Sequence, residues 1–213
     1  MARIVLTFGD SNTHGTMPIL TPGESRRFGP DIRWPRVMAA RLGAGWELVE
    51  EGLPGRTTQM GDPVMGAHMN GQEGLKIALA SHGPVDVLAL MLGTKALNHR
   101  FQPRPARITA GLAGLLDIAL HRDMLARHPG MQVLVICPPP VQETEPLRAD
   151  FLGAEMHGPA LAASYRAVAE ARGLAFFDAG SVIATSAVDG VHFEPEAHQT
   201  LGAALAEVVR AIG

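Results

Sequence analysis

Residues 85–92, Val85-Asp86-Val87-Leu88-Ala89-Leu90-Met91-Leu92, are apolar at every position but one. A strand with one solvent-exposed face would alternate between apolar and polar side chains, whereas a strand covered on both faces of a parallel sheet is apolar throughout. This stretch therefore predicts a central parallel strand. We predict four further strands, and all but the first of them are also apolar runs: Glu47–Glu50, Ile4–Phe8, Gln132–Cys137 and Ala175–Phe177.

Helical patterns separate these strands. We predict helices at Trp34–Leu42, Glu73–Ser81, Ala106–Arg127, Pro159–Arg172 and Glu196–Ile212. Strand and helix alternate along the whole chain, which is typical of βαβ units. The expected fold is α/β: a three-layer, doubly wound sheet of five parallel strands with helices on both faces. Right-handed crossovers would place the carboxyl ends of all strands at one edge, where ligands bind in such sheets.

Length and composition limit the class of protein. The chain has 213 residues, which favours one domain over 1–213, with 46% apolar and 18% charged residues. The formal net charge is −3 and there is no run of Lys or Arg, so we expect neither nucleic acid nor a membrane surface as partner. The single cysteine, Cys137, fits a reducing compartment. We found no signal-peptide pattern and expect a cytoplasmic protein.

A candidate nucleophile follows the first predicted strand, in Gly9-Asp10-Ser11-Asn12. Gly9 and Gly15 permit a sharp turn there, and a helix beginning at this point would direct backbone N–H groups toward an anion. Asp10 and Ser11 are also good helix-capping residues, so a purely structural role remains open from this segment alone. The Gly-x-Ser-x-Gly elbow of ordinary α/β-hydrolases is absent.

A candidate base and carboxylate lie near the other end of the chain, in Asp189-Gly190-Val191-His192. The spacing allows the Asp189 carboxylate to turn back to Nδ1–H of His192, which leaves Nε2 free as a base. Alone, this pattern is also compatible with an ordinary surface turn. Because both segments follow predicted strands, we expect Ser11, His192 and Asp189 to meet at one sheet edge, as acyl transfer through a serine ester requires.

These segments resemble the sequence blocks of the SGNH (GDSL-type) hydrolases, in particular the small bacterial arylesterase and acyltransferase branch. The resemblance extends over essentially the whole chain. The matching blocks are Phe8-Gly9-Asp10-Ser11, Glu51-Gly52-Leu53-Pro54-Gly55-Arg56-Thr57-Thr58, Met91-Leu92-Gly93-Thr94 and Asp189-Gly190-Val191-His192.

The resemblance implies a flavodoxin-like SGNH hydrolase fold and a role for each matching residue. Ser11 would be the nucleophile, His192 the base and Asp189 its orienting acid, with the backbone N–H groups of Ser11 and Gly55 in the oxyanion hole. It further implies hydrolysis of short-chain or aryl carboxylic esters, with acyl transfer to alcohols as an additional reaction. Such proteins take small-molecule esters, need no metal or other cofactor, and often form homo-oligomers.

The sequence departs from the family at one block. The family pattern Gly-x-Asn-Asp supplies an Asn side chain as third oxyanion donor, but here Lys95 and Ala96 occupy the last two places. Three interpretations remain: Lys95 donates from its ammonium, Asn98 donates from three residues further on, or the site has no third donor. We place Lys95 in the predicted oxyanion hole. The alternative function is a non-catalytic or impaired binding protein with the same fold.

Other candidates carry weaker predictions. Cys137 is expected to be a small buried residue, and His14, His68 and His99 lack metal-ligand spacing. Arg56 could contact an acidic substrate or form a structural ion pair. Loop position suggests Trp34, Phe101 and residues 141–158 as walls of the substrate pocket.

Overall fold

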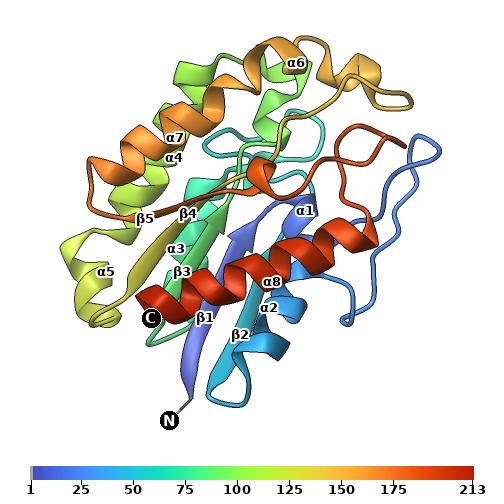
Figure 1. Ribbon diagram of the computed structural model, residues 1–213. Helices are drawn as coiled ribbons and strands as arrows, with labels where there is room; N and C mark the ends of the chain where they lie inside the picture. Colours follow the sequence, from blue (N-terminus) through green and yellow to red (C-terminus); the bar gives the residue numbers. More distant parts are fainter. Residues whose placement is uncertain (1) are drawn as a thin grey trace.

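The computed structural model describes residues 2–213 and contains a five-stranded parallel sheet between two layers of helices (Figure 1). The strands lie in the order β2-β1-β3-β4-β5. Their bounds are β1 Arg3–Gly9, β2 Trp46–Gly52, β3 Val87–Met91, β4 Gln132–Cys137 and β5 Ala175–Asp178. The predicted α/β fold with five parallel strands is confirmed. The strand order reverses between β1 and β3, and open sheets of this kind bind ligands at that point.

Helices α2 (Trp34–Leu42) and α8 (Pro195–Ile212) cover one face of the sheet, and α8 crosses the front of the sheet in Figure 1. Their apolar side chains pack in one cluster with Val5 of β1 and Ala89 of β3. Trp34 and Met38 from α2 are completely buried in this cluster. Residue 47 of β2 is exposed and the rest of the strand is half-buried, because β2 lies at the sheet edge.

The opposite face is covered by α3 (Gly71–Ser81), α4 (Pro105–Ala119) and α7 (Ala160–Glu170). Leu6 of β1 and Leu88 of β3 point into this second cluster, next to residues that point into the first. Successive side chains of a strand point to opposite faces of the sheet. Two apolar layers therefore explain why the strands are apolar at consecutive positions.

The remaining elements are short. They are α1 Ser11–His14, α5 Arg122–Arg127, α6 Ala154–His157, and the 3₁₀ turns η1 Ala67–Met69, η2 Lys95–Leu97, η3 His99–Phe101, η4 Arg148–Phe151 and η5 Ala179–Ser181. All except α5 lie in segments that follow the carboxyl end of a strand. Within residues 2–213, no helix is both long enough and apolar enough to cross a membrane.

One predicted helix is wrong in extent. The structure divides Ala106–Arg127 into α4 and α5, and His121 between them has extended backbone angles. The His121 ring accepts a hydrogen bond from the Asp123 amide and so caps α5. No residue of α5 is buried, whereas α4 buries six. Within α5 only Met124 packs, partly buried, against the core, so little anchors a continuation of α4 against the sheet.

His198 joins the two helices on the first face. Its ring is completely buried, and Nδ1 accepts a hydrogen bond from the Trp34 amide at 3.3 Å. The rings of Phe28 and Phe193 contact it edge-on, each with a centroid separation of 5.5 Å. Burial, with smaller contributions from the charges of His192 and Arg33, lowers the pKa of His198 from 6.5 to about 4. The folded protein therefore holds this imidazole neutral.

We predict an acid-dependent loss of stability from His198. Between pH 6.5 and pH 4 the unfolded chain binds a proton at this residue that the folded chain does not, so the free energy of unfolding falls as pH falls. A pKa difference of this size corresponds to about 3 kcal/mol, fully lost near pH 4. Urea unfolding at pH 7, 5.5 and 4 measures this loss of unfolding free energy.

The matched variant is His198→Asn, whose side-chain oxygen can still accept from Trp34. Asp10, whose carboxyl pKa burial raises to about 6, titrates in the same range but cancels when the two proteins are compared. From pH 7 to pH 4 the free energy of unfolding of wild type should fall by about 3 kcal/mol more than that of the variant. Parallel pH profiles for the two proteins would refute the assignment.

Candidate active site

Ser11 is the first residue of α1, immediately beyond the carboxyl end of β1. Asp10 caps this short helix, because its Oδ1 accepts a hydrogen bond from the Asn12 amide at 3.0 Å. Gly52 is packed against the turn so closely that a Cβ atom there would lie 2.3 Å from the His14 nitrogen. Asp10 is thus the capping residue of this segment, whereas the Ser11 side chain makes no capping hydrogen bond.

The structure brings the three predicted catalytic side chains together. Nε2 of His192 lies 3.1 Å from Oγ of Ser11, and Nδ1 of His192 lies 2.6 Å from Oδ2 of Asp189. Asp189 is completely buried and His192 nearly so. Burial alone would raise the pKa of Asp189, but the hydrogen bond and charge of His192, with backbone amides, hold it below its ordinary value. The carboxylate is therefore charged where it meets the imidazole.

Backbone groups from two loops hold this arrangement in place. Oδ1 of Asp189 accepts from the amides of Val191 and His192, both at 2.9 Å, and Oδ2 accepts from the Ile19 amide at 2.8 Å. Nδ2 of Asn12 donates to the Val191 carbonyl at 3.1 Å, which ties the nucleophile turn to the His192 loop. The sequence interpretation missed Asn12 and Ile19. Only the place of Asn12 beside Ser11 could have indicated a role.

Two backbone N–H groups meet the requirement for an oxyanion hole. Neither the Ser11 nor the Gly55 amide donates a hydrogen bond within residues 2–213, although unpaired N–H groups are rare in buried segments. Gly55 is buried and has a φ of +90°, which favours glycine. A Cβ atom there would lie 2.6 Å from the Met65 side chain. Both residues line the same cavity.

Arg56 connects the loop that carries Gly55 to the strand that precedes Ser11. Its buried guanidinium donates from Nη1 to the Gly9 carbonyl at 3.0 Å and also to the Glu51 carbonyl. It stacks on the Phe8 ring, with 4.0 Å between Cζ and the ring centroid. Arg56 does not line the cavity, so the structural interpretation fits it and substrate contact does not.

The cavity beside Ser11 has a volume of about 200 Å³. Both candidates for the third oxyanion donor, Lys95 and Asn98, line it. Oδ1 of Asn98 accepts from the Arg100 amide at 3.1 Å, and its Nδ2 has no hydrogen-bond partner among residues 2–213. Other lining residues come from the loops after β1, β2, β4 and β5: Thr16, Ile19, Glu24, Ser25, Pro54, Met65, Leu147, Asp150, Phe151 and Val191.

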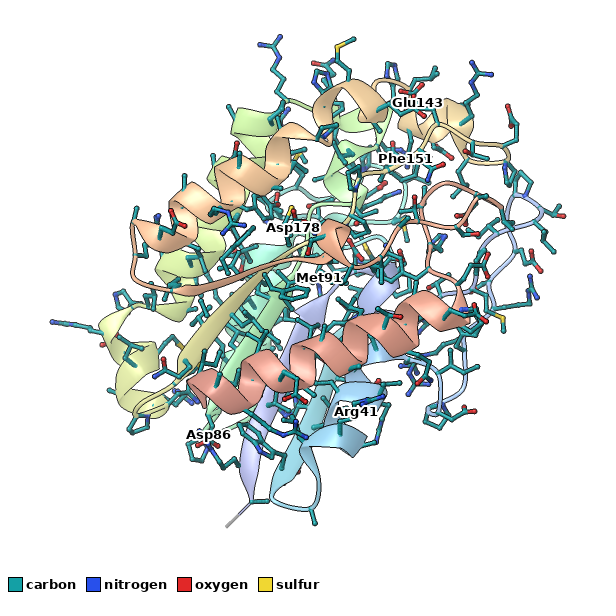
Figure 2. The ribbon with its side chains drawn as sticks, viewed as in Figure 1. Arg41, Asp86, Met91, Glu143, Phe151 and Asp178 are labelled. Carbon is teal, nitrogen blue, oxygen red and sulfur yellow. The ribbon has the colours of Figure 1, made fainter. Side chains whose placement is uncertain are left out.

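The predicted pocket walls are partly wrong. Trp34 is buried in the core between α2 and α8, and Phe101 is buried outside the cavity lining. Of residues 141–158, only Leu147, Asp150 and Phe151 line the cavity. In Figure 2, Asp86 immediately precedes β3, Met91 ends it, and Phe151 lies beyond its carboxyl end, at the Met91 side. The loop after β4 reaches the site, whereas α2 faces the core.

The sequence predicts no metal site among its scattered histidines and no catalytic role for its single cysteine. Among residues 2–213 no three His, Cys, Asp or Glu side chains are arranged to hold a metal ion. Cys137 is buried, and burial raises the pKa of its thiol far above its ordinary value, so it is unreactive at neutral pH.

The family of the chain follows from comparison with known proteins. The model of the GDSL-like lipase/acylhydrolase family matches residues 7–200. The comparison with curated proteins gave no match. The fold and the matched blocks define an SGNH-type carboxylic ester hydrolase, and the chain belongs to the GDSL-like lipase/acylhydrolase family. The predicted family is confirmed.

Solved structures resemble the chain over its whole length. An aryl esterase of M. smegmatis has 40% identity and a TM-score of 0.94, with 100% of each chain covered. A carbohydrate acetylesterase from Sinorhizobium meliloti has 37% identity and a TM-score of 0.94, covering 99% of this chain and 100% of its own. A putative arylesterase from Agrobacterium tumefaciens has 36% identity and a TM-score of 0.89, with the same coverage.

We predict that Arg56 positions the Gly55 loop relative to Ser11. Arg56→Met should lower the turnover number by about tenfold to a hundredfold while KM changes little, because small misplacements of catalytic groups are costly. Arg56→Lys keeps the charge but replaces the planar guanidinium, which donates from several nitrogens, with a single ammonium group. The activity of this variant should therefore lie between those of wild type and Arg56→Met. Steady-state kinetics on an aryl acetate, with circular dichroism to verify folding, make the measurement. A folded Arg56→Met protein with wild-type turnover would contradict the prediction.

Proposed function

We propose that the protein is a serine esterase that hydrolyses short-chain or aryl carboxylic esters through an acyl-serine intermediate. The observation that carries this proposal is the continuous hydrogen-bonded series from Asp189 through His192 to Oγ of Ser11. A buried carboxylate on Nδ1 fixes the imidazole tautomer whose Nε2 can accept the serine proton. The small cavity and the similarity to an aryl esterase and a carbohydrate acetylesterase support compact acyl groups such as acetyl.

In the proposed mechanism, Oγ of Ser11 attacks the ester carbonyl carbon as its proton passes to Nε2 of His192. The backbone N–H groups of Ser11 and Gly55 donate to the oxygen that becomes negative. Collapse of the tetrahedral intermediate expels the alcohol, which takes the proton from His192. Water then repeats the sequence at the acyl-serine and releases the acid. An alcohol in place of water gives acyl transfer.

We also propose that the chain acts as a homo-oligomer in the cytoplasm. The side chains of Leu20 and Val64 are 65% and 79% exposed, and each is the chain neighbour of a cavity-lining residue. Exposed apolar side chains beside a site are candidates for burial against another copy. Light scattering of the purified protein measures the number of subunits.

Ser11→Ala should abolish ester hydrolysis with the fold intact. Loss of the nucleophile typically lowers turnover by at least about 10⁴-fold. A fluorophosphonate probe should label wild-type protein at Ser11 and leave the variant unlabelled. Ser25→Ala is the control, because Ser25 lines the same cavity and has no part in the mechanism. If Ser11→Ala kept most of its turnover of p-nitrophenyl acetate, the proposal would be abandoned in favour of a binding protein.

The third oxyanion donor is tested by separate changes at Lys95 and Asn98. Whichever side chain donates, its replacement by Ala should lower the turnover number by roughly 10²-fold, with less effect on ground-state binding. Lys95 stands in the place of the family Asn, whereas Asn98 has a free Nδ2 and an orientation held by Arg100. Lys95→Asn should keep or raise activity if position 95 supplies the donor.

Asn98→Asp separates donation from capping at position 98. It preserves an oxygen that can accept from the Arg100 amide and removes the Nδ2 donor. If Asn98 donates, both Asn98→Ala and Asn98→Asp should lose turnover, and Lys95→Ala should not. Losses below about twofold at both positions would mean that the two backbone amides suffice.

A further inference from the structure

Lys95 is a half-buried cation in the same cavity as the nucleophile. Its side chain is 18% exposed and lines the cavity together with Ser11 and His192. The ammonium group donates no hydrogen bond to any of residues 2–213. The nearest carboxylate oxygen, Oδ2 of Asp62, lies 4.0 Å away, beyond hydrogen-bond distance. All three N–H donors of Lys95 are therefore available to a ligand.

Asp62 only partly offsets this charge, because its carboxylate already has closer partners. Oδ1 accepts from the amides of Val64 at 2.8 Å and Met65 at 3.0 Å. Nη1 of Arg100 also donates to it, at 3.1 Å. The buried Asp62 carboxylate thus forms its closer ion pair with Arg100, and it also holds the loop that carries Met65.

The two carboxylates that line the cavity, Glu24 and Asp150, also have partners. Oε2 of Glu24 accepts from the Leu20 amide at 3.0 Å, and Oε1 lies 2.5 Å from Nε of Arg26. Oδ1 of Asp150 lies 3.4 Å from Nη2 of Arg100. Among the charged groups that line the cavity in residues 2–213, Lys95 alone makes no hydrogen bond.

A partly desolvated ammonium without an acceptor is unfavourable. Burial, followed by repulsion from Arg100, lowers the pKa of Lys95 below its ordinary value. Asp62 and Asp150 attract the ammonium from a distance, but neither accepts a hydrogen bond from it. An anionic oxygen from a bound molecule would supply the missing hydrogen bonds. Charge-assisted hydrogen bonds of this kind are about twice as strong as neutral ones.

We propose that Lys95 forms an anion-binding subsite that binds a carboxylate carried by the ester substrate, so that the enzyme prefers anionic esters to neutral ones of the same shape. This inference rests on the proposed esterase function. It differs from an oxyanion role, in which Lys95 would stabilise the transition state of every ester equally. The substrate class that follows is small esters with a free carboxylate.

The test compares substrates that differ only in charge. The pairs are 3-acetoxybenzoate with 3-acetoxybenzamide, and 4-acetoxybenzoate with 4-acetoxybenzamide. The quantity measured is the ratio of kcat/KM for the anionic member to kcat/KM for the neutral member, in wild type and in Lys95→Met. For at least one pair the ratio should fall about tenfold or more in the variant, the effect of one hydrogen bond between charged groups. Intrinsic differences in leaving group cancel in this comparison.

Lys76→Met is the matched control. Lys76 is the only other lysine of the chain, and it lies on α3 with a 53% exposed side chain, paired with Glu73 at 3.0 Å. Its replacement removes the same charge from the protein without touching the cavity. The substrate ratio of Lys76→Met should equal that of wild type.

A measurement without turnover completes the test. 3-Hydroxybenzoate should protect Ser11 from a fluorophosphonate probe at lower concentration than 3-hydroxybenzamide, and Lys95→Met should remove the difference. If Lys95→Met lowers kcat/KM equally for both members of each pair, Lys95 is an oxyanion donor and the subsite is refuted. An unchanged ratio with normal turnover also refutes the subsite and leaves the esterase intact. Failure of wild-type Ser11 to label would overturn the esterase proposal itself.

Discussion

The site depends on one buried charge, the Asp189 carboxylate. It is completely removed from solvent and is stabilised by amides from two loops and by the His192 ring. A buried carboxylate without such partners would take up a proton. Because these donors belong to the loops after β1 and β5, the charge can persist only when both loops are in place. The same contacts that stabilise Asp189 therefore orient His192 toward Ser11.

The sheet brings these loops together. The strand order 2-1-3-4-5 reverses direction between β1 and β3, so the chain leaves these neighbouring strands toward opposite faces and opens a crevice at their carboxyl ends. Ser11 follows β1, and the Lys95–Asn98 segment follows β3. Arg56 adds a cross-connection from the loop after β2 to the end of β1. Helices on both faces keep the strands buried and rigid beneath the site.

The segment after β3 shows how a departure from the family pattern changes the chemistry of one wall. The hydroxyl of buried Tyr165 donates to the Leu92 carbonyl at 2.9 Å, and Gly93 packs against it in a backbone conformation with φ of +145°. This hydrogen bond supports the turn that precedes Lys95. Lys95, the first residue of η2, and Asn98, which lies between η2 and η3, then line the same cavity. Lys95 thus stands in the place of the family Asn and Ala96 in the place of its Asp, while the amide of Asn98 enters the cavity from three residues beyond Lys95.

The amino-acid sequence by itself determined the fold class, the five strands, and the roles expected of Ser11, Asp189 and His192, because apolar periodicity and short motifs are local properties. It could not determine where the helix pattern of Ala106–Arg127 breaks, since burial against the sheet decides that. It also could not separate a substrate contact from a structural role for Arg56, or place Trp34 in the core. Contacts with Asp189 from Ile19, and with Val191 from Asn12, join residues about 170 positions or more apart. Only the tertiary structure decided them, because hydrogen bonds between distant loops depend on how the sheet aligns its strand ends.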